Sequence, residues 1–329
     1  MKKINWGIIS TAKIGTKKVI PAMQKGKYSH ITAIASRSIE TAQNTAKKLN
    51  IPKAYGSYRQ LLDDPDIEAV YIPLPNHMHV EWTINALKAG KHVLCEKPVA
   101  INVNEAEYLH QKVKEFPHLK VMEAFMYRLH PQWQAAKKLV KEGKIGELRN
   151  IHSIFSYYND DRNDIRNQKN IGGGGLLDIG CYCISLSRFL FNAEPKRVCS
   201  IIEYDPQLKI DRLTTGMMEF QHGTSAFTCS TQLIGHQKVD IFGTQGKIEI
   251  DKPFTPSPDK PSKIIYQTES HRKKIECELC NHYTIQGDLF SQAILNNTPV
   301  PIPLEDSIEN MRVIDKVFES YQKRTWIDV

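Results

Sequence analysis

The sequence lacks any apolar run of the roughly 18 residues that a membrane-spanning helix needs. A short apolar stretch follows Lys2 and Lys3, but Lys13 interrupts it and no small-residue cleavage site of a signal peptide follows. We therefore expect a cytoplasmic protein without a membrane partner. Of the 329 residues, 41% are hydrophobic and 24% charged, which is typical of a soluble globular protein with two domains.

The seven cysteines, an odd number, form no disulfide framework. Cys277 and Cys280 have the spacing of half a zinc site, with His271 and His282 nearby, but no second pair lies at normal spacing. We interpret them as ordinary buried or edge-strand thiols and expect no metal.

The net charge of +8 is not gathered into a basic stripe with interleaved aromatic residues, so we expect no nucleic-acid partner. A phosphate-rich cofactor and a solvated surface explain the excess more simply.

In the first 124 residues, short apolar runs alternate with segments of helical spacing. The predicted strands are Ile4–Ile9, Ile31–Ala35, Ala69–Ile72, His92–Cys95 and Leu119–Glu123, and the predicted helices are Ile14–Met23, Ile39–Leu49, Tyr58–Leu62, Val80–Leu87 and Val103–Val113. This alternation indicates right-handed crossovers and a doubly wound parallel sheet of the α/β class.

The first crossover of such a sheet is the place for the dinucleotide fingerprint G-x-G-x-x-G. Only Gly15 of the three glycines is present, and Ser10 and Ala12 replace the other two. Small residues still let a backbone approach a pyrophosphate, and the helix that begins near Lys13 offers its N-terminal amides. Ser10, however, adopts a positive φ less freely than glycine. Alone, the motif is equally consistent with a plain strand-to-helix turn.

The second predicted strand ends at Ser36-Arg37-Ser38, without the acidic residue that would bind a ribose 2′-hydroxyl. An arginine and two hydroxyls suit a 2′-phosphate, which favours NADP over NAD. The alternative is that Arg37 is an exposed residue and Ser38 an ordinary helix N-cap.

Two further loops follow strands of the predicted sheet. The segment Pro73–His79 is stiffened by two prolines, and its backbone could line the cofactor, whereas His77 and His79 fit a helix start better than a metal site. Lys97 follows the strand His92–Cys95 and precedes Pro98. Because ligands bind beyond the carboxyl ends of parallel strands, Lys97 is a candidate catalytic cation.

The second half of the chain has a different pattern. Strand segments follow one another through short polar turns, at Val198–Tyr204, Gly216–Phe220, Thr224–Leu233, Val239–Phe242 and Lys247–Ile250. Gly243-Thr-Gln-Gly246 is a hairpin signal, so an antiparallel sheet is predicted. The small and hydroxyl-bearing residues at 224–231 suit either a sheet face against another subunit or a half-wet strand.

Four glycines, 172–175, precede a predicted helix at Leu176–Phe191. Asp178 and Tyr182 are four residues apart and share a helix face. Such a pair is usually solvated, but a run of four glycines rarely introduces a surface helix because it costs so much conformational entropy.

These strings together resemble the glucose–fructose oxidoreductase and inositol dehydrogenase family, nearly end to end. The strings are Trp6–Gly15, Glu96-Lys97-Pro98, Glu123-Ala-Phe-Met-Tyr-Arg128, Gly172–Tyr182 and Gly243–Gly246. The chain is most similar to the branch of dihydrodiol dehydrogenases and NADP-dependent xylose dehydrogenases. The resemblance implies a Rossmann domain at 1–124, and at 125–329 a substrate-binding and dimerisation α/β domain on a large, mainly antiparallel open sheet.

The resemblance also implies site residues. Lys97 matches the catalytic lysine, and Asp178 and Tyr182 match the catalytic aspartate and tyrosine or histidine. The resemblance and the loops described above together predict the cofactor-binding residues. These are Ser10, Thr11, Ala12, Ile14, Gly15, Ser36, Arg37, Ser38, Pro73, Leu74, Asn76, His79, Glu96, Lys97 and Pro98. Arg128 and Arg166 are weaker candidates, for substrate contact or for structural ion pairs. The loop Tyr158–Asn170 is longer than expected and is a candidate substrate lid.

The expected chemistry is hydride transfer between NADP or NAD and a sugar at C1 or a trans-dihydrodiol. Tyr182 would act as general acid/base with Lys97 as its electrostatic partner, because a tyrosine pKa of about 10 needs a nearby cation at pH 7. In a second version Lys97 itself moves the proton. Asp178 would orient substrate hydroxyls. A sugar reductase and a non-catalytic NAD(P)H sensor are the alternatives, and a homodimer or higher homo-oligomer through the C-terminal sheet is expected.

Overall fold

The computed structural model describes residues 2–329, which divide into two compact units. The first unit runs to Met126 and includes Asn281–Ile308, and the second comprises Tyr127–Cys280 and Glu309–Val329. The predicted boundary after residue 124 lies close to the first change of unit. The assignment of all later residues to the second domain was wrong for Asn281–Ile308.

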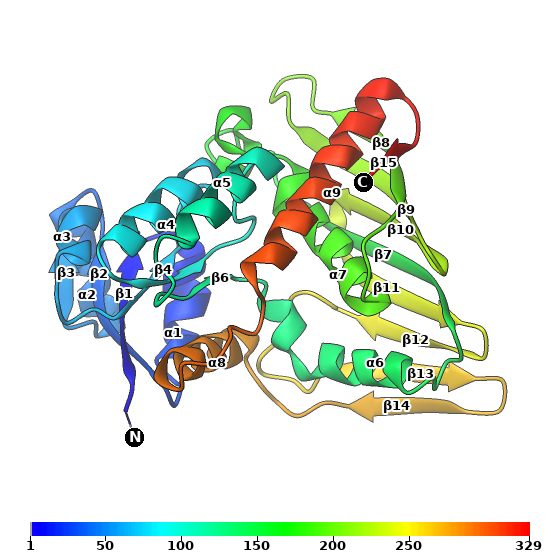
Figure 1. Ribbon diagram of the computed structural model, residues 1–329, viewed down its shortest axis with the longest axis horizontal. Coiled ribbons are helices and arrows are strands. Elements are labelled where there is room, and N and C mark those ends of the chain that lie inside the picture. The colour runs from blue at the N-terminus through cyan, green and yellow to red at the C-terminus, as the bar shows by residue number, and fades with distance from the viewer. Residues whose placement is uncertain (1) are drawn as a thin grey trace. The chain divides into compact units, whose positions relative to one another are not determined.

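The first unit contains a six-stranded sheet in the order β3-β2-β1-β4-β5-β6, all parallel, with helices on both faces (Figure 1). Its strands are β1 (Ile4–Ile9), β2 (Ser29–Ala35), β3 (Lys53–Tyr55), β4 (Ala69–Ile72), β5 (His92–Cys95) and β6 (Val121–Glu123). Its helices are α1 (Ile20–Met23, after a π-helical turn Gly15–Val19), α2 (Ile39–Leu49), α3 (Tyr58–Leu62), α4 (His79–Lys88), α5 (Val103–Val113) and α8 (His282–Leu295). The predicted doubly wound sheet is confirmed.

Helix α8 joins the first unit because it packs on β1 and β2. Trp6 Nε1 on β1 donates to Ser291 Oγ at 3.1 Å, and both groups are buried. The carboxylate of Asp288 accepts from the backbone N–H groups of Lys27 and Tyr28, each at 2.9 Å. These contacts are between residues 260 to 285 positions apart, so local sequence patterns could not reveal them.

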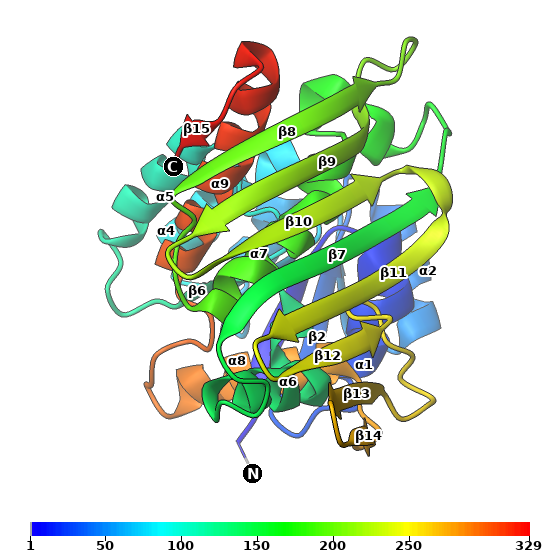
Figure 2. The same cartoon turned by 90° about the vertical axis from the view of Figure 1, so that its right-hand side faces the viewer.

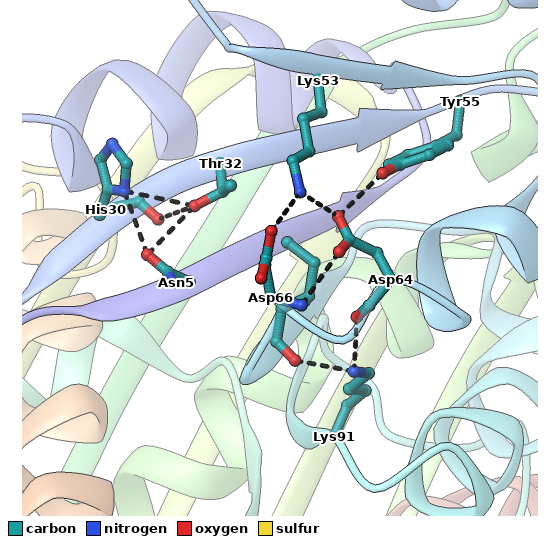
Figure 3. A network of polar contacts seen from close by, with 9 residues as sticks. Asn5, His30, Thr32, Lys53, Tyr55, Asp64, Asp66 and Lys91 are labelled. Carbon is teal, nitrogen blue, oxygen red and sulfur yellow. Dashed lines mark hydrogen bonds and ion pairs between the residues drawn. The ribbon is translucent and has the colours of Figure 1, made fainter.

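An ionic network fastens the short edge strand β3 (Figure 3). Lys53 Nζ lies 2.9 Å from Asp64 Oδ2 and 2.7 Å from Asp66 Oδ2, and Tyr55 OH donates to Asp64 at 2.8 Å. Lys91 Nζ donates to the backbone oxygens of Asp64 and Ile67, each at 2.8 Å. The network ties β3 to the turn after α3 and needs no catalytic explanation.

The second unit contains a nine-stranded sheet in the order β14-β13-β12-β11-β7-β10-β9-β8-β15. Only the β7–β10 pair is parallel, and all other pairs are antiparallel. The strands are β7 (Leu148–Tyr158), β8 (Arg197–Tyr204), β9 (Asp211–Phe220), β10 (Gly223–Ser230), β11 (Gln232–Gly243), β12 (Gly246–Asp251), β13 (Lys263–Thr268), β14 (Arg272–Glu276) and β15 (Ile327–Asp328). The predicted large, mainly antiparallel sheet is confirmed.

One face of this sheet carries helices and the other is open. Helices α6 (Pro131–Lys141), α7 (Cys181–Phe191) and most of α9 (Leu304–Lys323) belong to this unit, and Figure 2 shows the sheet from the face without them. The helical region Lys169–Phe191 is long and apolar enough to cross a membrane, but most of it is buried, as in a core helix. Along β10, Phe227 and Cys229 are buried while Thr224 is exposed, so one face of this strand is accessible in the single chain.

The strand predicted at Thr224–Leu233 is divided at Thr231. Thr231 N donates to Arg212 O at 3.1 Å, and Thr231 O accepts from Asn159 N at 2.8 Å. The chain therefore leaves β10 at this point and returns as β11.

Candidate active site

The predicted cofactor-binding residues of the first unit lie in four loops at one edge of its sheet. Residues 10–15 follow β1, 36–38 follow β2, 73–79 follow β4 and 96–98 follow β5. Because the sheet is parallel, these loops all lie beyond the carboxyl ends of the strands, where ligands of such sheets bind.

The first loop compensates for its missing glycine with a hydroxyl group. Ser10 has φ +121°, a conformation that glycine adopts more readily. Its Oγ donates to Pro73 O at 3.1 Å and accepts from Ala12 N at 3.1 Å, which stabilises the turn. At Gly15 a Cβ would lie 3.4 Å from Pro73 Cγ, so the loop lies close to the next one. Thr11, Ala12 and Ile14 are half-buried. This cradle fits a dinucleotide pyrophosphate.

The end of β2 contains both features that the sequence left open. Ser38 is the N-cap of α2 and accepts from Thr41 N at 3.3 Å, and its own N–H donates to Ser36 Oγ at 3.4 Å. Arg37 is exposed. Ser38 therefore caps the helix, while the guanidinium of Arg37 is accessible to a phosphate.

Around Lys97 the backbone is held by the half-buried Glu96 and the buried His79. Glu96 Oε1 accepts from Tyr71 OH at 2.5 Å, and Glu96 Oε2 accepts from Lys97 N at 3.3 Å. The Lys97–Pro98 peptide bond is cis. His79 connects this loop to the one after β4, since its ring nitrogens lie 2.7 Å from Pro98 O and 2.8 Å from Leu74 O. The imidazole of His79 thus bridges two loops, and Leu74 beside it is buried.

Glu123 is a residue of this region to which the sequence assigned no role. It ends β6 with a side chain only 1% exposed, and its Oε1 accepts from Val99 N at 2.8 Å, two residues after Lys97. Burial raises the pKa of Glu123 to about 7, against the hydrogen bond from Val99 N that lowers it. The sequence signal that could have pointed to Glu123 was its position in the string Glu123–Arg128, one of those that carry the family resemblance.

In the second unit, backbone N–H groups of the glycine run donate hydrogen bonds to carbonyl oxygens of the preceding loop. Gly174 N donates to Arg166 O at 2.8 Å, and Gly173 N donates to Gln168 O at 3.0 Å. A Cβ at Gly173 would lie only 2.6 Å from Arg166 O, which explains why glycine is needed there. The loop 158–170 is therefore fastened to the glycine run in this structure, and does not have the form of a detached lid.

Asp178 lies in a cluster that the sequence only partly predicted. It is in the π-helical turn Leu176–Gly180, and its Oδ2 accepts from Tyr157 OH at 2.6 Å and lies 3.4 Å from Arg166 Nε. Burial raises the pKa of Tyr157, and the carboxylate of Asp178 raises it further, so Tyr157 stays a hydrogen-bond donor. The sequence motifs did not identify Tyr157 as a site residue. The available signal was its position two residues after Phe155, on the same face of β7.

Tyr182 is 4% exposed, at the start of α7, among aromatic rings. Its ring centroid lies 5.6 Å from that of Tyr127, 5.7 Å from Phe155 and 5.4 Å from Phe254. Arg128, by contrast, packs its guanidinium 4.8 Å from the ring of Phe189, farther along α7. The second unit therefore brings Tyr157, Arg166 and Asp178 together and places Tyr182 four residues farther along the helical segment.

Among residues 2–329, no group of three or more His, Cys, Asp or Glu side chains is arranged to hold a metal ion. Cys280 Sγ lies 3.3 Å from His130 Nε2, and His130 Nδ1 accepts from Gln132 N at 3.1 Å. This histidine acts as the N-cap of α6.

The sheet and the loops at its carboxyl edge define a dinucleotide-binding protein. Residues 4–124 match the model of an oxidoreductase family with an NAD-binding Rossmann fold, and residues 133–249 match the GFO/IDH/MocA C-terminal domain. The chain belongs to the GFO/IDH/MocA family of oxidoreductases, as the sequence motifs predicted.

Three similar proteins illustrate the family. A D-xylose 1-dehydrogenase (NADP+) from Haloferax volcanii is 34% identical over 96% of both chains. A trans-1,2-dihydrobenzene-1,2-diol dehydrogenase from Xenopus laevis is 33% identical over 74% of both chains. The crystal structure of a 3-ketoreductase from Actinomadura kijaniata with NADP and TDP-benzene has a TM-score of 0.91 at 28% identity and covers 97% of this chain and 98% of that one. The predicted branch is thus confirmed.

Proposed function

We propose that this enzyme transfers a hydride between NADP and C1 of an aldose or a carbon of a trans-dihydrodiol. The observation that carries the proposal is the Tyr157–Asp178–Arg166 cluster, four residues from the buried Tyr182. The named activities of the xylose and dihydrodiol dehydrogenases support the substrate class.

The nicotinamide, when bound, supplies the hydride acceptor or donor. The chain must then move a proton from the substrate hydroxyl, and Tyr182 is our general acid/base. Because a tyrosine has a pKa of about 10 in water, it needs a cation nearby to act as a base at pH 7, and we assign that role to Lys97. The alternative in which Lys97 itself carries the proton uses the same two groups.

Asp178 is our residue for orienting substrate hydroxyls. Its Oδ2 is fixed by two donors, Tyr157 OH and Arg166 Nε, which restrict how the carboxylate can turn. A carboxylate held in one orientation can accept from a hydroxyl group in a defined direction. Arg166 thus supports Asp178, and its own contact with substrate is not required.

The reverse reaction, reduction of a sugar ketone or aldehyde, is a second candidate. The similarity to a 3-ketoreductase favours it, because the same proton and hydride positions serve both directions. A cofactor-binding sensor without turnover is the alternative outside enzymes, and the set of Lys97, Asp178 and Tyr182 argues against it.

We further propose NADP as the preferred cofactor and a homodimer as the assembly. The exposed Arg37, with no acidic residue beside it, suits a 2′-phosphate. The open sheet face carries exposed apolar side chains, among them Ile201 at 75% and Met217 at 48%, which suits a second copy of the chain. Light scattering of the purified protein tests the dimer, and a monomer at micromolar concentration would refute it.

Turnover on a panel of aldoses, dihydrodiols and ketosugars, with NADPH fluorescence titrations beside it, tests the function. Lys97→Ala is expected to lower kcat at least roughly a hundredfold while NADPH still binds. Lys88→Ala, which removes an exposed lysine of α4, is the control and should leave kcat unchanged. Binding without turnover on any panel member would favour the sensor, and near-normal turnover of Lys97→Ala would refute the mechanism.

A further inference from the structure

Asp211 is a buried carboxylate that contacts the start of the helical segment bearing Asp178 and Tyr182. It is the first residue of β9 and only 3% exposed. Its Oδ2 accepts from Leu176 N at 2.5 Å, and a hydrogen bond from Gly175 N lowers its pKa. The side chain thus occupies the place of an N-terminal capping group, supplied from a strand 35 residues away.

The glycine run is shaped to admit this carboxylate. Gly174 has φ +126°, and a Cβ there would lie 1.9 Å from Asp211 Oδ1. The N–H groups of Gly173 and Gly174 donate to Gln168 O and Arg166 O. Two sets of acceptors therefore fix the run, one from the preceding loop and one from Asp211.

Two opposing effects act on the charge of Asp211, and burial is the larger one. The N-terminal end of a helical segment has a partial positive charge, which an ionised carboxylate complements. Burial raises the pKa of Asp211 to about 7, and the neighbouring carboxylate of Asp178 contributes to the rise. Cys229 on β10 and Tyr204 on β8 also interact with Asp211, and burial raises the pKa of both.

We propose that Asp211 is a positioning residue for the reaction. By holding the backbone of residues 174–176 it sets the direction in which Asp178 and Tyr182 present their side chains, without touching substrate itself. The proposal rests on the roles assigned above to Asp178 and Tyr182.

The first test is the pH profile of Asp211→Asn, which keeps the size of the side chain and removes its charge. We expect kcat at pH 8 to fall roughly 10- to 100-fold, as for small misplacements of reacting groups, with NADPH affinity unchanged. The inflection of the wild-type kcat profile near pH 7 should disappear. Asp205→Asn is the control, since Asp205 is also buried and accepts from Gln207 N and Leu208 N at 2.8 Å. It should keep the wild-type kcat and profile.

The second test is amide hydrogen exchange, which requires no turnover. Protection of the amides at 173–178, relative to the rest of the second unit, should fall severalfold in Asp211→Asn. In the wild type it should fall as pH rises through 7, because the closed segment binds the proton of Asp211 more tightly than an opened one. The wild-type measurement applies even if the variant does not fold.

These outcomes separate two failures. A wild-type enzyme that turns over, together with an Asp211→Asn variant of unchanged kcat and pH profile, overturns the positioning role and leaves the proposed function standing. A wild type without turnover on the whole panel refutes the proposed function. Amide exchange at 173–178 then tests the contact of Asp211 with the backbone of residues 174–176. Faster exchange in Asp211→Asn than in the wild type supports this contact, and unchanged exchange overturns it.

Discussion

Glu123→Gln should remove a large part of the pH dependence of stability. The pKa of Glu123 is raised to about 7 in the folded protein from an ordinary value of 4.5. Between these values the folded state holds a proton that the unfolded chain has released, so stability falls as pH rises. The contribution of this group is fully present below pH 4.5 and is lost as pH rises through 7. At about 1.4 kcal/mol for each pH unit, it changes by about 2 to 3 kcal/mol between pH 5 and pH 8.

The variant is neutral throughout this range, and its amide oxygen can still accept from Val99 N. Urea denaturation of both proteins at pH 5 and pH 8 measures the effect, in the transition that includes the first unit. The loss of stability from pH 5 to pH 8 should be smaller in the variant by about 2 to 3 kcal/mol. Glu105→Gln is the control, because Glu105 also accepts a backbone N–H, from Ile101 at 3.3 Å. An equal pH dependence in Glu123→Gln and the wild type would refute the reasoning.

Three other predictions concern the site. Tyr157→Phe removes a donor to Asp178, and steady-state kinetics should show kcat/KM for substrate falling roughly tenfold with NADPH affinity intact; an unchanged kcat/KM would contradict the role of the cluster. Ser10→Ala leaves a positive φ without its hydrogen bonds and should weaken NADPH binding severalfold, whereas Ser10→Gly should bind nearly as tightly as the wild type, by fluorescence titration. Arg37→Ala should lower NADPH affinity at least about tenfold and leave NADH affinity unchanged; equal losses for both cofactors would count against a 2′-phosphate site.

Local patterns predicted the first sheet because its signals are local. Helix α2 spans Ile39–Leu49 as predicted, since Ser38 caps its start and the residue after it, Asn50, adopts the left-handed conformation that ends helices. The strands β4 and β5 also have the predicted bounds, because they are short apolar runs between turn residues.

Other parts of the fold depend on contacts that no local pattern contains. Strand β7 was not predicted, and it lies between β10, to which it is parallel, and β11. Its interior-facing positions include the buried Ser153, so the hydrophobic alternation is interrupted. The segment 281–308 was assigned to the wrong unit because its partners on β1 and β2 lie far back in the sequence.

The site shows the same division. Lys97, Asp178 and Tyr182 were predicted from motifs, while Tyr157 and Asp211 were missed because each contacts the helical segment from a different strand. A polar residue at a strand start, such as Asp211, is read from sequence as part of a turn.

The route of the chain has a consequence for synthesis on the ribosome. The polypeptide passes between the two units three times, at residues 126/127, 280/281 and 308/309, the last of these inside α9. The buried partner of Trp6, Ser291, is made only after most of the second unit. The part of β1 and β2 that α8 covers, including Trp6, therefore stays exposed until nearly the whole chain has been synthesised. A fragment ending near residue 126 lacks α8 and would expose this apolar surface, so a stable nucleotide-binding module cut from this protein must include residues 281–308 grafted onto it.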